Sequence, residues 1–125
     1  MKPQIYGIVG HPLGHSLSPT LHNHWFCECG FENKLYCAWP IPPDKLDDFV
    51  RAVRLLPISG ASVTIPHKET ITPYLDELSP AARQVGAVNT LYWRGDSLAG
   101  ENTDVCGFMA PLLAGGESIN SALVL

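Results

Sequence analysis

The chain has 125 residues, of which 46% are hydrophobic and 16% charged, so it contains enough apolar material for one small domain or for part of a larger protein. Its formal net charge of −4 provides no attraction to nucleic acid or to an anionic membrane, and we expect neither as a partner. The N-terminal residues MKPQIYGIVG contain no long apolar run, which argues against a signal peptide or membrane span and favours a cytoplasmic protein.

Strand and helix patterns alternate from the start of the chain. β-Branched and aromatic residues predict a strand over 5–10. Ser18 is predicted to be the N-cap of the following helix, with Pro19 at its first position and Gly30 after its end. The apolar stripe predicted on this helix consists of Leu21, Trp25 and Cys29, with Phe26 beside it.

The middle of the chain continues this alternation. A second strand is predicted over 35–39. Residues 42–44 begin a second helix, whose apolar residues recur with helical spacing: Leu46, Phe49, Val50 and Val53. A third strand over 60–65 ends before Pro66, and a short helical segment over 67–75 follows it.

The next segment predicts a short helix and a β-hairpin. Ser79-Pro80 begins the helix, and Gly86 ends it. Residues 88–93 and 97–100 are predicted to form the hairpin around Arg94-Gly95-Asp96. Because a glycine-centred turn is expected there in any case, we prefer this interpretation of the triplet to a cell-adhesion motif.

The end of the chain predicts one more helix and then a new unit. The helix begins near Asp104 and is expected to direct apolar side chains inward: Val105, Phe108, Met109 and Leu112. Residues 115–118 are interpreted as a break and residues 122–125 as a strand. We therefore expect residues 1–113 to be one domain and 114–125 to be a linker and the first strand of a truncated dinucleotide-binding domain. The alternating elements predict a three-layer α/β fold, with a mixed, mostly parallel sheet and helices on both faces.

The histidines and cysteines invite a metal-site interpretation that their spacing does not support. Four of the five histidines lie in the segment GHPLGHSLSPTLHNH, but the segment contains no acidic residue. His22 and His24 are two positions apart on a helix and so point about 200° apart around it. We predict no metal site. The cysteines lack a C-x-x-C spacing and are expected to be reduced thiols packed as small hydrophobes: Cys27, Cys29, Cys37 and Cys106.

Polar residues follow the predicted strands, at the edge where open α/β sheets bind ligands. Ser16 and Ser18 come after the first strand and before a helix N-terminus, where hydroxyls and free N–H groups can hold a carboxylate. Thr64 lies at the carboxyl end of the third strand and Lys68 just past it, and an amine beside a substrate hydroxyl can accept a proton. Taken alone, Ser18 could be only an N-cap and Lys68 only a solvated surface residue.

Two further polar residues lie near the predicted hairpin. Asn89 is near the start of a strand, where an interior amide is unfavourable unless it bonds a partner. Asp104, in Asn102-Thr103-Asp104, could be only a helix N-cap. A carboxylate and a lysine in one pocket would also share proton transfer with a substrate oxygen.

Together these segments resemble the substrate-binding domain of the shikimate dehydrogenase family. The matching segments are Gly10-His11-Pro12, residues 15–19 with His22-Asn23, residues 63–68, residues 86–90, and residues 102–104 with Gly107. The resemblance implies an enzyme that reduces 3-dehydroshikimate to shikimate with a nicotinamide cofactor, usually NADPH, on the route to chorismate and the aromatic amino acids.

The resemblance also implies a role for each candidate residue. The substrate-binding set would be Ser16, Ser18, Thr64, Lys68, Asn89 and Asp104. The two serines would hold the substrate carboxylate, and Thr64, Asn89 and Asp104 would bind ring hydroxyls. Lys68 and Asp104 would be the catalytic pair, in which Lys68 handles the proton of the alkoxide.

The chain departs from the family pattern in three respects. Ser62 stands where family members usually have asparagine. No G-x-G-x-x-G motif is present, and Gly115-Gly116 does not supply one. A glutamine that the family contributes from a later part of the chain is also absent. We therefore expect NADP to bind mainly to a C-terminal domain outside this chain, and the chain alone to bind shikimate weakly and to catalyse nothing.

Two alternatives remain open. One is a quinate or dual quinate/shikimate dehydrogenase, although keeping both Ser16 and Ser18 favours shikimate. The other is a non-catalytic shikimate-binding module, against which the presence of both Lys68 and Asp104 argues, because binding alone needs no proton-transfer pair. The sequence does not decide between NADP and NAD or define an oligomeric state.

Overall fold

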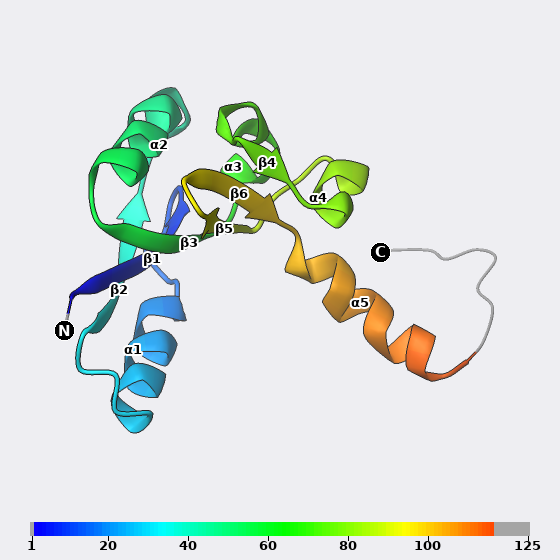
Figure 1. Ribbon diagram of the computed structural model, residues 1–125, viewed down its shortest axis with the longest axis horizontal. Helices are drawn as coiled ribbons and strands as arrows, with labels where there is room; N and C mark the ends of the chain where they lie inside the picture. The colour runs from blue at the N-terminus through cyan, green and yellow to red at the C-terminus, as the bar shows by residue number, and fades with distance from the viewer. Residues whose placement is uncertain (1, 117–125) are drawn as a thin grey trace.

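The structure, a computed structural model, describes residues 2–116. Within these residues the chain forms a six-stranded sheet in the order β2-β1-β3-β5-β6-β4 (Figure 1). β1 pairs in parallel with β2 and β3, and β4 does so with β6, whereas β5 pairs antiparallel with β3 and β6. The strands are β1 (Gln4–Gly10), β2 (Lys34–Pro40), β3 (Ile58–Val63), β4 (Glu77–Leu78), β5 (Thr90–Arg94) and β6 (Ser97–Glu101). The predicted mixed, mostly parallel sheet is confirmed.

Helices cover both faces of this sheet. α1 and α2 lie on opposite sides of it, which confirms the predicted three-layer α/β arrangement (Figure 1). The helices are α1 (Ser18–Glu28), α2 (Leu46–Leu55), α3 (His67–Thr70), α4 (Pro80–Val85) and α5 (Thr103–Ala114). Two short 3-10 helices, η1 (Pro43–Lys45) and η2 (Thr72–Tyr74), precede α2 and follow α3.

The main hydrophobic core lies between α2 and the sheet. The inward positions predicted on α2 are all buried: Leu46, Phe49, Val50 and Val53. They belong to one cluster with Val9 and Val63 from neighbouring parallel strands. Burying each such side chain contributes about 1.5–3 kcal/mol. This layer therefore contributes substantially to the stability of the described residues.

α1 contacts the sheet through a different face from the one predicted. Leu21 and Trp25 are 55% and 63% exposed, and α1 has no buried residue. Asn23 faces the sheet instead: its amide nitrogen donates to the Tyr36 carbonyl at 2.9 Å and its amide oxygen accepts from the Tyr36 N–H at 2.8 Å. β2 is an edge strand, so these backbone groups need a partner outside the sheet. Satisfying them turns the predicted apolar stripe toward solvent.

The two Ser-Pro helix starts behave differently. At α4 the prediction is confirmed, because the Ser79 hydroxyl accepts from the Ala82 N–H at 3.0 Å and Gly86 ends the helix at a φ of 75°. Ser18 is not the N-cap of α1: it is the first helical residue, and Leu17, already in the right-handed helical region, precedes it. An N-cap residue that bonds the helix normally has an extended backbone, as Ser79 does.

α5 does not pack as predicted. Phe108 and Met109 are exposed, and Val105 and Leu112 are only half-buried. α5 leaves the edge of the sheet and runs away from it, so no other described element covers its apolar side chains (Figure 1). The inward face predicted for this helix is therefore wrong for residues 2–116.

Other predictions meet mixed outcomes. The hairpin of β5 and β6 is confirmed, with Gly95 at a φ of 60°, whereas the short strand β4 was not predicted. The cysteines do not pack as small hydrophobes, since Cys27, Cys29 and Cys106 are exposed and Cys37 is half-buried. The strand predicted over 122–125, and most of the linker unit 114–125, lie outside the described residues.

Neither a membrane-spanning helix nor a metal-binding cluster is present within residues 2–116. None of their helices combines the length and apolar character that crossing a membrane requires. No group of three or more His, Cys, Asp or Glu side chains in residues 2–116 is arranged to hold a metal ion.

Candidate active site

The segments that carry the predicted site residues leave the sheet side by side, at the edge formed by the ends of β1, β3 and β6 and the start of β5. The Thr64 N–H donates to the Val9 carbonyl at 2.9 Å, which places the end of β3 beside the end of β1. The Asn89 N–H donates to the Glu101 carbonyl at 3.0 Å, and the Asn89 carbonyl accepts from Val63 at 2.7 Å. The start of β5 and the end of β6 therefore reach the same edge.

A glycine allows the first two of these segments to approach closely. A Cβ atom at Gly10 would collide with the Thr64 methyl carbon and lie 2.9 Å from Leu13 Cδ2. The His11 N–H then donates to the Ile65 carbonyl at 3.1 Å, so the loops after β1 and β3 remain paired beyond the strands. Any larger residue at position 10 would separate the loop after β1 from Thr64.

The serine loop, residues 11–18, joins β1 to α1. The Ser16 hydroxyl accepts a long hydrogen bond of 3.4 Å from the Ser18 N–H, and both serines are half-buried. His22 Nδ1 lies 2.9 Å from the Ser18 carbonyl oxygen, which can only accept, so Nδ1 carries the proton. The His22 ring also stacks on Tyr36, with centroids 4.0 Å apart. These contacts hold two hydroxyls at a helix N-terminus, where the helix dipole favours a negative group.

Two hydrogen bonds fix the backbone around Lys68, one made by the residue itself and one by its neighbour His67. The preceding residue, His67, is fully buried, and its Nε2 donates to the Ile41 carbonyl at 2.6 Å. The Lys68 carbonyl accepts from the Val88 N–H at 2.7 Å. α3 is therefore tied both to the loop after β2 and to the segment that leads into Asn89.

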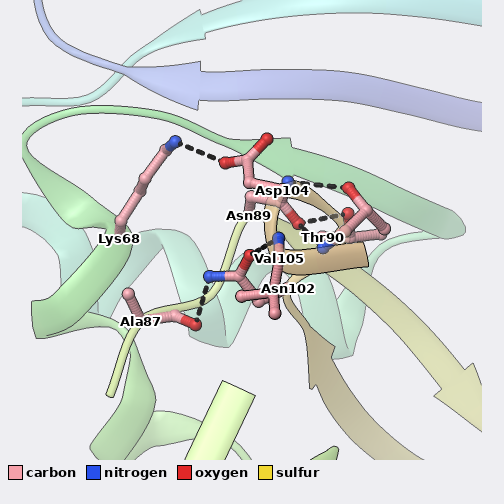
Figure 2. A network of polar contacts seen from close by, with 8 residues as sticks. Lys68, Ala87, Asn89, Thr90, Asn102, Asp104 and Val105 are labelled. Atoms are coloured by element: carbon pink, nitrogen blue, oxygen red, sulfur yellow. Dashed lines mark hydrogen bonds and ion pairs between the residues drawn. The ribbon is translucent and has the colours of Figure 1, made fainter. Parts of the chain in front are cut away.

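Lys68 and Asp104 come together from different parts of the chain. Lys68 Nζ lies 3.1 Å from Asp104 Oδ2, and their side chains are 35% and 65% exposed (Figure 2). An ion pair this exposed contributes only about 0–1 kcal/mol to stability. The pair places an amine and a carboxylate together in solvent contact at the strand ends, which is an arrangement suited to proton transfer.

Asn102, and not Asp104, caps α5. The Asn102 side-chain oxygen accepts from the Val105 N–H at 3.2 Å, and its amide nitrogen donates to the Ala87 carbonyl at 3.1 Å (Figure 2). Asn102 is only 4% exposed. Because this neighbouring amide satisfies the helix end, the Asp104 carboxylate is left to pair with Lys68. The alternative that Asp104 is merely an N-cap is wrong.

Sequence reasoning missed Asn102 and Tyr36. Asn102 and Asp104 both have N-cap chemistry, and only the fold reveals which one is buried. The Tyr36 hydroxyl donates to Ser62 Oγ at 2.7 Å, and burial raises the pKa of Tyr36, partly offset by this hydrogen bond. Tyr36 and Ser62 line a cavity of about 420 Å³ on the α1 face of the sheet, with Tyr6, His22, Phe26 and Tyr92. Ser62 thus faces this cavity.

The predicted residues divide into a group joined by hydrogen bonds around Asp104 and a second group that these hydrogen bonds do not include. Lys68 bonds Asp104, and Asn89 bonds Thr103, the residue before Asp104. No hydrogen bond within residues 2–116 joins this group to the side chains of Ser16, Ser18 or Thr64. All of them lie on segments that leave the sheet at the same edge, which therefore carries hydroxyl, amide, amine and carboxylate groups.

Comparison with known proteins shows which family this chain resembles in sequence. A family model described as the shikimate dehydrogenase substrate binding domain matches residues 8–91. The shikimate dehydrogenase (NADP(+)) of Maridesulfovibrio salexigens is 50% identical over 125 residues, covering 99% of this chain and 46% of that protein. The corresponding enzyme of Pelobacter propionicus is 52% identical over 123 residues, covering 98% and 44%.

A solved structure agrees with the sequence matches. Shikimate 5-dehydrogenase from Listeria monocytogenes, in complex with shikimate and NAD, has a TM-score of 0.83 at 39% identity, over 94% of this chain and 40% of that one. The chain therefore spans less than half the length of the relatives it matches.

Proposed function

Because the chain belongs to the shikimate dehydrogenase substrate-binding domain family, we propose that the complete protein reduces 3-dehydroshikimate to shikimate with NADPH. In this proposal the described residues bind the substrate and supply the proton, and the rest of the protein holds most of the cofactor. The reaction is a step on the route to chorismate and the aromatic amino acids.

The observation that carries the proposal is the Lys68–Asp104 pair, 3.1 Å apart at the strand ends. Reduction of a ketone to an alcohol needs a proton at the carbonyl oxygen, and a lysine ammonium can donate it. Lys68 becomes a neutral amine as the hydroxyl forms, and the reverse reaction returns the proton to it. Asp104 stabilises the ammonium form and accepts a hydrogen bond from a substrate hydroxyl.

The remaining residues suit a polyhydroxylated ring acid. Ser16 and Ser18 are proposed to bind the carboxylate, supported by their position at the N-terminus of α1. Thr64 and Asn89 are proposed to bind ring hydroxyls. A site that bonds each hydroxyl leaves its own polar groups unpaired when an analogue lacks one, and therefore rejects that analogue strongly.

The cofactor assignment rests on the relatives. The M. salexigens and P. propionicus relatives are NADP(+) enzymes by name, which supports NADP here. NADPH supplies the hydride that the substrate carbon receives. No strand-to-helix connection in residues 2–116 carries a G-x-G-x-x-G turn, and the connection from β1 to α1 is occupied by the serine loop. We infer that this chain positions the substrate and contributes little to NADP binding itself.

The test is a substrate panel with the complete protein. Oxidation rates are measured for shikimate and quinate, each with NADP+ and NAD+. The proposal predicts the highest kcat/KM for shikimate with NADP+. A higher value for quinate would establish the alternative quinate dehydrogenase. Shikimate binding by calorimetry without turnover of either substrate would establish the non-catalytic module instead.

A further inference from the structure

The Asn89 side chain is held from two directions by threonines. Its amide nitrogen donates to Thr103 Oγ1 at 2.7 Å, and its amide oxygen accepts from the Thr103 N–H at 3.0 Å. The same oxygen accepts from the Thr90 hydroxyl at 2.9 Å. Figure 2 shows Asn89 and Thr90 beside the Lys68–Asp104 pair.

These bonds settle which way the amide points. The Thr103 backbone N–H can only donate, so the atom facing it must be the Asn89 oxygen. A flipped amide would place an N–H against the Thr103 N–H and lose that hydrogen bond, because two donors cannot pair. The orientation is therefore imposed by the first residue of α5, and it does not depend on a bound ligand.

An inventory of the amide shows what remains for a ligand. An asparagine side chain has two N–H donors and an oxygen that accepts two hydrogen bonds. Both acceptor positions of Asn89 are used, by Thr103 and Thr90, and one N–H is used by Thr103 Oγ1. Within residues 2–116, one N–H is left.

We propose that Thr103 and Thr90 are positioning residues that fix the Asn89 amide so that it meets the substrate as a hydrogen-bond donor only. The proposal rests on the proposed function and assigns a direction to one of its contacts. The substrate atom that Asn89 meets must accept.

The neighbouring carboxylate has the opposite character. Asp104, next to Thr103 in the chain, offers only acceptors when ionised. A substrate hydroxyl between these side chains can accept from Asn89 and donate to Asp104, whereas an ether or fluorine there cannot donate and an ammonium cannot accept. This pairing of one donor with one acceptor makes the site selective for a hydroxyl.

The test compares Thr103→Val with Thr103→Ser in the complete protein. Valine keeps the shape and the backbone N–H but removes the oxygen that accepts from Asn89, whereas serine keeps that oxygen. Because a hydrogen bond of this kind contributes about 0.5–1.5 kcal/mol, Thr103→Val should weaken shikimate binding by about 2- to 12-fold in calorimetry, with Thr103→Ser within about 2-fold of the parent protein. The rise in KM should exceed the fall in kcat.

Asn89→Asp provides a second measurement. The exchange keeps the size of the side chain and the oxygen that Thr103 and Thr90 bond, but it replaces the remaining N–H by an acceptor. It should weaken shikimate binding more than Thr103→Val does, with thermal unfolding near that of the parent protein. Thr103 is exposed, so its variants should also fold normally.

The outcomes separate the two proposals. If the parent protein binds shikimate but Thr103→Val binds it as well as Thr103→Ser does, or Asn89→Asp binds it undiminished, the positioning role is wrong and the proposed function stands. A parent protein that neither binds nor oxidises shikimate would overturn both.

Discussion

The layer under α2 and the edge at the strand ends are built from opposite kinds of side chain. In the α2 layer, Val53 is 1% exposed and packs among other apolar residues. At the edge, Lys68 and Asp104 keep 35% and 65% of their side chains in solvent contact. Under the proposed function, stability and catalysis therefore depend on different parts of this domain, so each should be alterable without the other.

Lys68→Ala in the complete protein should show the largest difference between its effect on turnover and its effect on stability. Because the variant removes the proposed proton donor, turnover should fall by about 10²- to 10⁴-fold. The free energy of unfolding should change by less than about 1 kcal/mol, since the ion pair is exposed. Steady-state kinetics and denaturant unfolding measure the two effects.

Lys45→Ala is the matched control, because Lys45 also pairs with an exposed aspartate, Asp48, at 3.8 Å, but on the α2 side of the molecule. It should leave turnover unchanged. Near-normal turnover in Lys68→Ala would show that another group donates the proton.

Leu46→Ala in the α2 layer should instead affect stability, because it changes the core and not the strand ends. Leu46 is 3% exposed, so its truncation should lower the free energy of unfolding by about 2–5 kcal/mol. Leu55→Ala is the matched control on the same helix, because Leu55 is 84% exposed, and it should change stability by less than about 0.5 kcal/mol. Equal effects of the two variants would contradict the assignment of the core.

The same contrast explains which predictions from sequence succeeded. The inward face of α2 was predictable because the apolar surface that covers it belongs to the same domain. The faces of α1 and α5 were not. On α1, bonds from Asn23 to an edge strand outweigh the apolar pattern, and α5 has no covering element within residues 2–116. Periodicity identifies an apolar face, but it does not identify what covers that face.

At the edge, the sequence predicted positions better than contacts. The predicted strand ends and the resemblance to a family placed Lys68, Asn89 and Asp104 near one edge of the sheet. The roles of Asn102 and Thr103 were not predictable, because an asparagine two residues before an aspartate offers two equivalent N-caps to sequence reasoning. Only the burial of Asn102 and the direction of its hydrogen bonds show that Asn102, and not Asp104, is the N-cap.

A smaller effect on the edge is expected from Ser16→Ala in the complete protein. The variant removes one hydroxyl proposed to bind the substrate carboxylate, and hydrogen bonds to charged groups contribute about 1.5–3 kcal/mol. The KM for shikimate should therefore rise about tenfold or more, with kcat changed much less. Ser97→Ala, at the far end of β6, is the control and should change neither constant. A normal KM in Ser16→Ala would remove this serine from the site.

The smallest effect concerns an ion pair that fastens α2 to the hairpin. Hydrogen bonds from Arg54, and then from the Leu98 N–H, hold the pKa of Asp76 below its usual value. The unfolded chain therefore binds this proton more readily than the folded one does. The stability that Asp76 contributes is present at neutral pH and is lost as the pH falls through the lowered pKa.

Denaturant unfolding of Asp76→Asn across the acidic range measures this contribution. The difference from the parent protein should shrink as the pH falls below the ordinary aspartate range, and Arg54→Leu should show the same trend. A difference that does not change with pH would contradict the assignment.

A crystal structure of the complete protein with shikimate bound tests the central claim most directly. The account predicts the carboxylate within hydrogen-bond distance of the Ser16 and Ser18 hydroxyls, and one ring hydroxyl within that distance of both Lys68 Nζ and the Asp104 carboxylate. Shikimate bound away from Lys68, for instance in the cavity beside Tyr36 and Ser62, would contradict it.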